Sequence, residues 1–139
     1  MLPVDIESIH HVALPVRDLE RSARFYKDVL GLVEIARPAF PFVGKWFQVG
    51  DQQLHLIVHP GSTLRTGKPL DSRDGHFAMR VRSFQQALES LRAKGFSEDR
   101  DRSDPFTMRV VPDATAGFPQ IQILDPDRNV IEINSAQLD

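Results

Sequence analysis

Four polar side chains interrupt apolar stretches of this chain, and all four are of types that bind metal ions. His11 and His76 each open a strand-like segment. His55 lies inside QLHLIV, and Glu132 lies inside NVIEIN. Imidazole and carboxylate together suit Zn, Ni, Co, Mn or Fe(II), and the set does not choose among these ions. We therefore expect one divalent metal site if the fold brings the four side chains together.

An internal repeat explains why these residues come in pairs. The stretch HFAMRVR, which begins at His76, aligns with HVALPVR, which begins at His11, so that the histidine, alanine, valine and arginine are in register. Each copy then offers one ligand from its first strand and one from its last. If the copies pack around a pseudo-twofold axis, the four side chains converge on one point.

The first copy is predicted to fold as β-α-β-β-β. Residues 9–16 alternate between apolar and other side chains, as a half-buried strand does. Asp18 is expected to cap the following amphipathic helix, and Gly31 is expected to end it. After a short strand, residues 45–49 and 53–58 predict a hairpin.

The second copy predicts the same order of elements. Ser83 and the glutamine three residues later fit a capping box, and Gly95 ends the predicted helix. We expect a strand over 96–102 and an irregular segment over 104–117. Residues 118–134 then predict a closing hairpin around DPDR.

Length and composition predict a single α+β domain. The chain has 139 residues, of which 41% are hydrophobic, enough for one packed core. We assign the whole of 1–139 to this domain. The first module covers about 8–58, the second about 75–135, and a polar connector over about 59–74 joins them.

The charge and cysteine content exclude several classes of protein. A net charge of −2 without a long basic run argues against nucleic-acid binding. The absence of cysteine excludes disulfides and thiolate zinc sites. No apolar run approaches the roughly 20 residues of a membrane span, and no signal peptide is visible. We therefore expect a cytoplasmic protein that does not interact with membranes.

Three motifs resemble the vicinal oxygen chelate superfamily: HHVALPVRDLERSARFYKDVLGL, GHFAMRV and DPDRNVIEIN. This superfamily includes glyoxalase I, methylmalonyl-CoA epimerase, extradiol dioxygenases and fosfomycin-resistance proteins. The resemblance implies paired β-α-β-β-β modules that form a U-shaped mixed sheet around a metal ion, and a homodimer. By position, it implies the ligands His11, His55, His76 and Glu132.

The resemblance leaves three activities open. The first is a metal-dependent lyase or isomerase of the glyoxalase type, in which Glu132 moves a proton at the carbon next to a carbonyl. The second is an Fe(II) ring-cleaving dioxygenase that uses His11, His76 and Glu132. The third is a non-catalytic protein that binds a small molecule, as bleomycin-resistance proteins do.

The same resemblance bears on the substrate, which we expect to be a small oxygenated molecule. Where glyoxalase I places an arginine that helps hold the glutathione carboxylate, this chain has Pro15, and at a second arginine position it has Ser72. We therefore expect the hemithioacetal of glutathione to be a poor substrate. The candidates for the substrate pocket are Arg80, Phe40, Phe42, Trp46 and His59.

Overall fold

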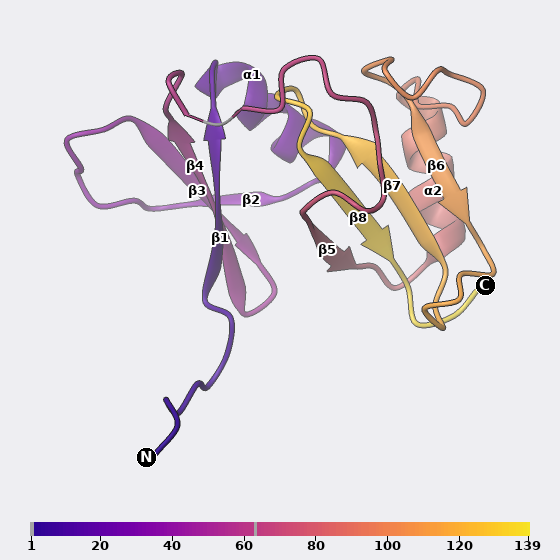
Figure 1. Cartoon of the computed structure of the whole chain (residues 1–139), viewed down its shortest axis with the longest axis horizontal. Coiled ribbons are helices and arrows are strands. Elements are labelled where there is room, and N and C mark those ends of the chain that lie inside the picture. Colours follow the sequence, from indigo (N-terminus) through magenta and orange to yellow (C-terminus); the bar gives the residue numbers. More distant parts are fainter. Residues whose placement is uncertain (1, 63) are drawn as a thin grey trace.

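Two four-stranded sheets, one from each copy of the repeat, make up the computed structural model, which describes residues 2–62 and 64–139 (Figure 1). The strand orders are β1-β4-β3-β2 and β5-β8-β7-β6. In each sheet the first strand pairs in parallel with the last, and the other neighbours are antiparallel. The prediction of two tandem β-α-β-β-β modules is confirmed, although the two sheets remain separate and are not closed around a common centre.

The elements follow the chain in the predicted order. The first module contains β1 (His11–Val16), α1 (Leu19–Arg24), the π-helical turn η1 (Phe25–Val29), β2 (Val33–Ile35), β3 (Gly44–Val49) and β4 (Gln52–Val58). The second module contains β5 (His76–Arg80), α2 (Phe84–Ala93), β6 (Met108–Val111), β7 (Gln120–Leu124) and β8 (Val130–Asn134).

The helix boundaries arise from local hydrogen bonds that the sequence predicted. The Asp18 carboxylate accepts from the backbone N–H of Arg21 at 3.0 Å, and the Ser83 hydroxyl accepts from that of Gln86 at 3.0 Å. Gly31 follows the first helix with φ +70°, the left-handed conformation that favours glycine. No helix in the described part of the chain is both long and apolar enough to cross a membrane.

Strand alternation separates a core side from a polar side in each sheet. Leu54 and Leu56 of β4 are buried in a core that also contains Ile131 of β8 and the buried faces of both helices. Because neighbouring residues of a strand point to opposite faces, His55 and Glu132 lie on the sides of their sheets away from this core. The period of two therefore places both predicted ligands on polar faces.

One predicted strand lies elsewhere. The prediction of a strand over 96–102 is wrong, and β6 (Met108–Val111) instead lies within the segment 104–117 that was expected to be irregular. In the misassigned stretch, the Asp101 carboxylate accepts hydrogen bonds from the backbone N–H and the hydroxyl of Ser103. Such local bonds compete with strand pairing.

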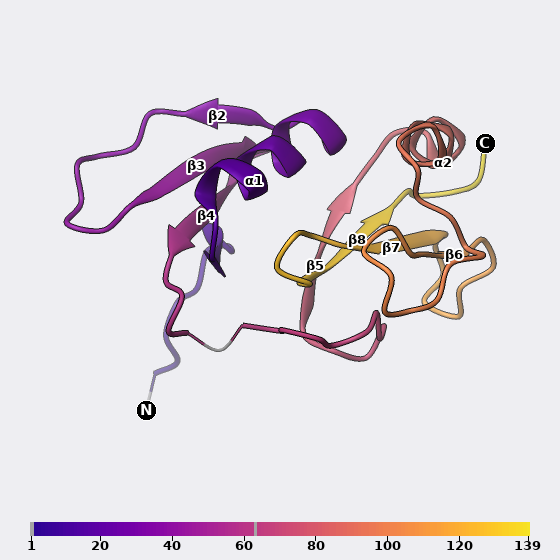
Figure 2. The same ribbon diagram turned by 90° about the horizontal axis from the view of Figure 1, so that it is seen from above.

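Buried hydrogen bonds join the two modules. They link Ser22 and Tyr26 of the first module to Asp127 and Asp125 of the second, and we call these four residues the helix–turn clamp. The α1–η1 segment lies between the first sheet and the second module (Figure 2). The Tyr26 hydroxyl donates to Asp125 Oδ2 at 2.7 Å, and the Ser22 hydroxyl donates to Asp127 Oδ2 at 3.2 Å. All four side chains are buried, so the clamp fixes the first helix on the β7–β8 turn.

Arg128 completes this turn in an unusual conformation. Its φ of +68° lies in the left-handed region. For a residue with a side chain, this conformation costs roughly 1–2 kcal/mol relative to the right-handed one. The guanidinium offsets that cost by donating to the carbonyl of Lys68 at 2.6 Å and to that of Ser103 at 2.7 Å. Arginine at this position therefore ties the connector and the loop before β6 to the β7–β8 turn.

Replacing Tyr26 with phenylalanine tests the clamp. The variant leaves the buried Asp125 carboxylate without one donor, and we expect it to lower the free energy of unfolding by about 1.5–3 kcal/mol at neutral pH, measured by urea denaturation. Burial raises the pKa of Asp125. The loss should shrink as the pH falls, because a protonated carboxyl depends less on the missing donor.

A double-mutant cycle with Asp125→Asn supplies the control. If the two residues interact as described, the combined variant should lose less stability than the sum of the two single variants. Additive losses, or a Tyr26→Phe protein as stable as the wild type, would contradict the clamp.

Candidate functional site

On the first sheet, His11 and His55 form a stacked pair. Their ring centroids are 4.1 Å apart with an angle of 16° between the ring planes. His55 also stacks on Trp46 of β3, with 4.1 Å between the ring centroids and an angle of 4° between the ring planes. The register places His55 directly opposite Trp46, which explains the contact. His55 is therefore buried between two rings, with 7% of its surface exposed.

This environment keeps His55 neutral. Burial, followed by the charges of His11, His10 and Arg37, lowers the pKa of His55 from 6.5 to about 4. Its Nε2 atom lies 2.8 Å from Gln53 Oε1. His10 precedes His11 in the sequence, and the Nδ1 atoms of the two rings are 2.8 Å apart. A neutral imidazole retains the lone pair that a metal ligand needs.

On the second sheet, His76 and Glu132 form the other pair. His76 Nε2 lies 3.5 Å from Glu132 Oε1. His76 Nδ1 lies 2.7 Å from the carbonyl oxygen of Asp74, which can only accept a hydrogen bond. In the neutral ring the proton therefore resides on Nδ1, and the Nε2 lone pair faces the carboxylate. A metal-binding histidine is oriented in the same way by a carbonyl behind it.

Two amides hold Glu132 from either side. Gln122 donates to its Oε1 at 3.2 Å, and Asn134 donates to its Oε2 at 2.8 Å. Each amide oxygen in turn accepts from an arginine, Arg109 at 3.2 Å and Arg80 at 2.6 Å. The sequence interpretation missed both amides, although their alternation in QIQIL and VIEIN places them on the glutamate's face.

The structure thus brings the four predicted ligands together two by two. Among residues 2–62 and 64–139, no group of three or more His, Cys, Asp or Glu side chains is close enough to hold one metal ion. A cavity of about 350 Å³ lies between the sheets, and it is lined by His76 from one and by Gln53, the partner of His55, from the other. The four-ligand metal site remains a prediction.

The aromatic candidates extend the histidine stack outward. The Phe40 ring lies 6.0 Å from Trp46 and 5.3 Å from Phe42. The Arg37 guanidinium lies 4.7 Å from the centre of the Phe40 ring. Phe40 and Phe42 are 41% and 44% exposed, which leaves them available to a ligand. His59 follows β4 and is exposed.

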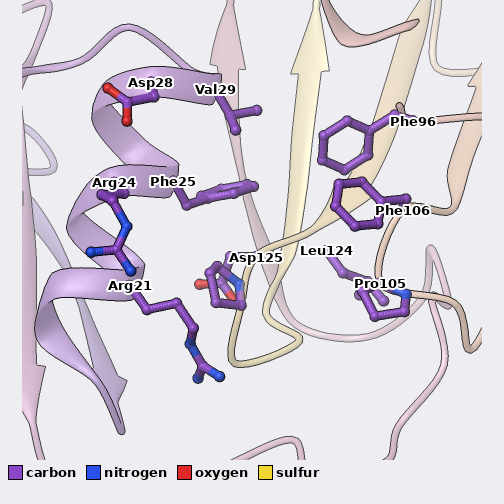
Figure 3. A pocket seen from close by; sticks show the side chains of 11 residues that line it. Arg21, Arg24, Phe25, Asp28, Val29, Phe96, Pro105, Phe106, Leu124 and Asp125 are labelled. Atoms are coloured by element: carbon purple, nitrogen blue, oxygen red, sulfur yellow. The ribbon is translucent and has the colours of Figure 1, made fainter. Parts of the chain in front are cut away.

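A second cavity, of about 520 Å³, lies between the first helix and the second module (Figure 3). Phe25 and Val29 wall it on one side, and Phe96 and Phe106 wall it on the other. None of the predicted site residues lines it. This cavity therefore belongs to the junction beside the clamp and not to the candidate metal site.

Trp46, the single tryptophan, reports on His55. An imidazolium quenches an adjacent indole, so we expect the fluorescence to fall as the pH drops through about 4, and not near 6.5. The free energy of unfolding should also decrease as the pH falls from about 6.5 to about 4. Over this range His55 takes up a proton in the unfolded chain but stays neutral in the folded one.

His55→Gln should abolish the fluorescence step, whereas His59→Gln, at an exposed position, should keep it. Circular dichroism at each pH separates quenching from unfolding. A step that persists in His55→Gln would disprove the assignment.

Comparisons with known proteins agree with this architecture. "Glyoxylase I 4" from Arabidopsis thaliana is 26% identical over 133 residues, which cover 94% of this chain and 72% of that protein. The crystal structure of a glyoxalase family protein from Bacillus anthracis is 21% identical with a TM-score of 0.75, covering 96% of this chain and 98% of that one.

Two further crystal structures share the fold. Lactoylglutathione lyase from Agrobacterium tumefaciens has a TM-score of 0.65 at 20% identity, over 94% of each chain. A mutant of the fosfomycin resistance protein FosX from Listeria monocytogenes, in complex with Mn(II) and dihydroxypropylphosphonic acid, has a TM-score of 0.69 at 18% identity, over 96% of this chain and 95% of that one. The model of the Glyoxalase/Bleomycin resistance protein/Dioxygenase superfamily matches residues 8–133, and the chain therefore belongs to that superfamily.

Proposed function

We propose that the protein is a metal-dependent lyase or isomerase of the glyoxalase type that acts on a small oxygenated molecule. The observation that carries this proposal is the His76–Glu132 pair, with 3.5 Å between Nε2 and Oε1. A ring nitrogen and a carboxylate oxygen face each other there, and both side chains are already oriented by neighbouring groups. Orientation of ligands before the metal binds is a property of functional metal sites.

The donor set suits a first-row divalent ion: Zn, Ni, Co, Mn or Fe(II). His76 and Glu132 would hold it from the second sheet, and His11 and His55 from the first. The stack of His11 on His55 would have to open so that both rings could turn a nitrogen toward the ion. A bound ion would supply Lewis acidity to two adjacent oxygens of the substrate.

Glu132 is the proposed general base. Its carboxylate is 5% exposed and accepts from two amides, so it is held in one place while a substrate proton is transferred. We do not include glutathione adducts among the proposed substrates. Pro15, on the His11 face of β1, and Ser72, in the connector, carry no charge with which to bind the glutathione carboxylates.

We further propose that a homodimer completes the site. The helix–turn clamp fixes the modules of one chain relative to each other, and their ligand pairs remain apart. A second copy can supply the missing half, so that His11 and His55 of one protomer face the partner subunit's His76 and the partner subunit's Glu132. A twofold axis would create two such sites.

Deuterium uptake tests the reaction. The protein is loaded in turn with Zn, Ni, Co, Mn or, without air, Fe(II), and incubated in D₂O with hydroxyacetone, dihydroxyacetone or hydroxypyruvate. These compounds present a hydroxyl and a carbonyl on adjacent carbons. We expect metal-dependent exchange at the hydroxyl-bearing carbon, detected by mass spectrometry, and a loss of roughly 10²–10⁴-fold in Glu132→Gln.

Metal analysis of the same samples provides the control. His76→Ala should lose its metal, whereas His59→Ala, at an exposed histidine, should retain it. Exchange that is equally fast in Glu132→Gln, or absent with every metal and compound, would refute the proposed reaction.

A further inference from the structure

Two arginines, one from each edge strand of the second sheet, lie on the same face as Glu132 and approach it from either side along that face. Arg80 extends from β5 to Asn134, its direct neighbour in the strand pairing. Arg109 extends from β6 to Gln122, which lies between it and Glu132 in the register. Each arginine therefore contacts the amide that holds one oxygen of the carboxylate.

The charges around Glu132 do not balance. In the described part of the chain, neither Arg80 nor Arg109 forms an ion pair with a carboxylate. The amides that they contact are neutral, so the hydrogen-bond chain Arg80–Asn134–Glu132–Gln122–Arg109 contains two cations and one anion. A divalent ion at the candidate site would increase the excess positive charge.

Both guanidinium groups also have donors to spare. Each guanidinium has five N–H donors, and one nitrogen of each is used in the bonds to the amides. Arg80 is exposed, and Arg109 is only half-buried. Phe118 lies 5.4 Å from Arg80, with its ring under the guanidinium, and supports the side chain without neutralising it.

We propose that Arg80 and Arg109 form an anion seat beside Glu132, and that the substrate carries a small oxyanion, a carboxylate or a phosphonate, next to the carbon where the proton moves. This inference rests on the proposed function and defines its substrate class. Guanidinium groups match the geometry of such oxyanions and bind them through paired N–H donors.

Binding to the metal-free protein tests the seat without requiring turnover. Methylphosphonate and acetate are titrated by calorimetry into the wild type, Arg80→Gln and Arg109→Gln. We expect at least one of the two anions to bind, and each arginine variant to weaken that binding roughly tenfold or more. The anion that binds more tightly identifies the phosphonate or the carboxylate class.

Two matched variants make the result specific. Arg92→Gln removes the same charge from α2, on the opposite side of the sheet, and should leave binding unchanged. Glu132→Gln removes the local negative charge and should not weaken binding, although it should slow the proposed reaction by the factor given above. If the arginines only orient the amides, anion binding will be absent or will not respond to their replacement, and the seat is refuted while the metal chemistry can still stand.

Discussion

The helix–turn clamp is the contact on which the arrangement of this protein depends. A buried tyrosine and a buried serine of the first module bind two buried carboxylates in the turn between the last strands of the second. Buried carboxylates are costly without donors, so each half of the clamp stabilises the other. The clamp fixes the orientation of the two sheets, and the orientation determines which of the predicted metal ligands can meet. Within the described residues of one chain, these ligands meet in pairs, and no third His, Cys, Asp or Glu side chain joins either pair in a group that could hold a metal ion.

The proposed site lies on the polar faces of the sheets because the core occupies the other faces. Alternation along β8 buries Ile131 and Ile133 against the helices and leaves Glu132 and Asn134 on the opposite side. On that side Glu132 still has only 5% of its surface exposed to solvent. The two neighbouring amides donate hydrogen bonds to its carboxylate and so offset the free-energy cost of burying it. A base held in this way is positioned before a substrate arrives, which is the main requirement for proton transfer.

Local patterns predicted most of the elements, because strand alternation, helix caps and glycines are local properties. Asp18, Ser83 and Gly31 act as predicted. The prediction of a strand over 96–102 was wrong because the Asp101 carboxylate accepts a hydrogen bond from the Ser103 backbone N–H, and this local bond competes with strand pairing. The clamp joins residues that are distant in the sequence, and Gln122 meets Glu132 only through the pairing of β7 with β8. Asn134 lies two residues from Glu132 on the same strand, so the alternation alone could have predicted its contact. Convergence of the four ligands depends on how the modules pack, and the repeat alone does not determine this packing.

The central claim is that two copies of the chain share each metal site, and subunit complementation tests it most directly. His11→Ala and His76→Ala chains are co-expressed with different affinity tags, and mixed dimers are isolated by both tags. Each variant alone should retain no metal. A mixed dimer should contain one intact site, built from the unchanged His11 of one chain and the unchanged His76 of the other, and hold half the wild-type metal content. Mixed dimers without metal, or a protein that is monomeric at micromolar concentration, would contradict the account.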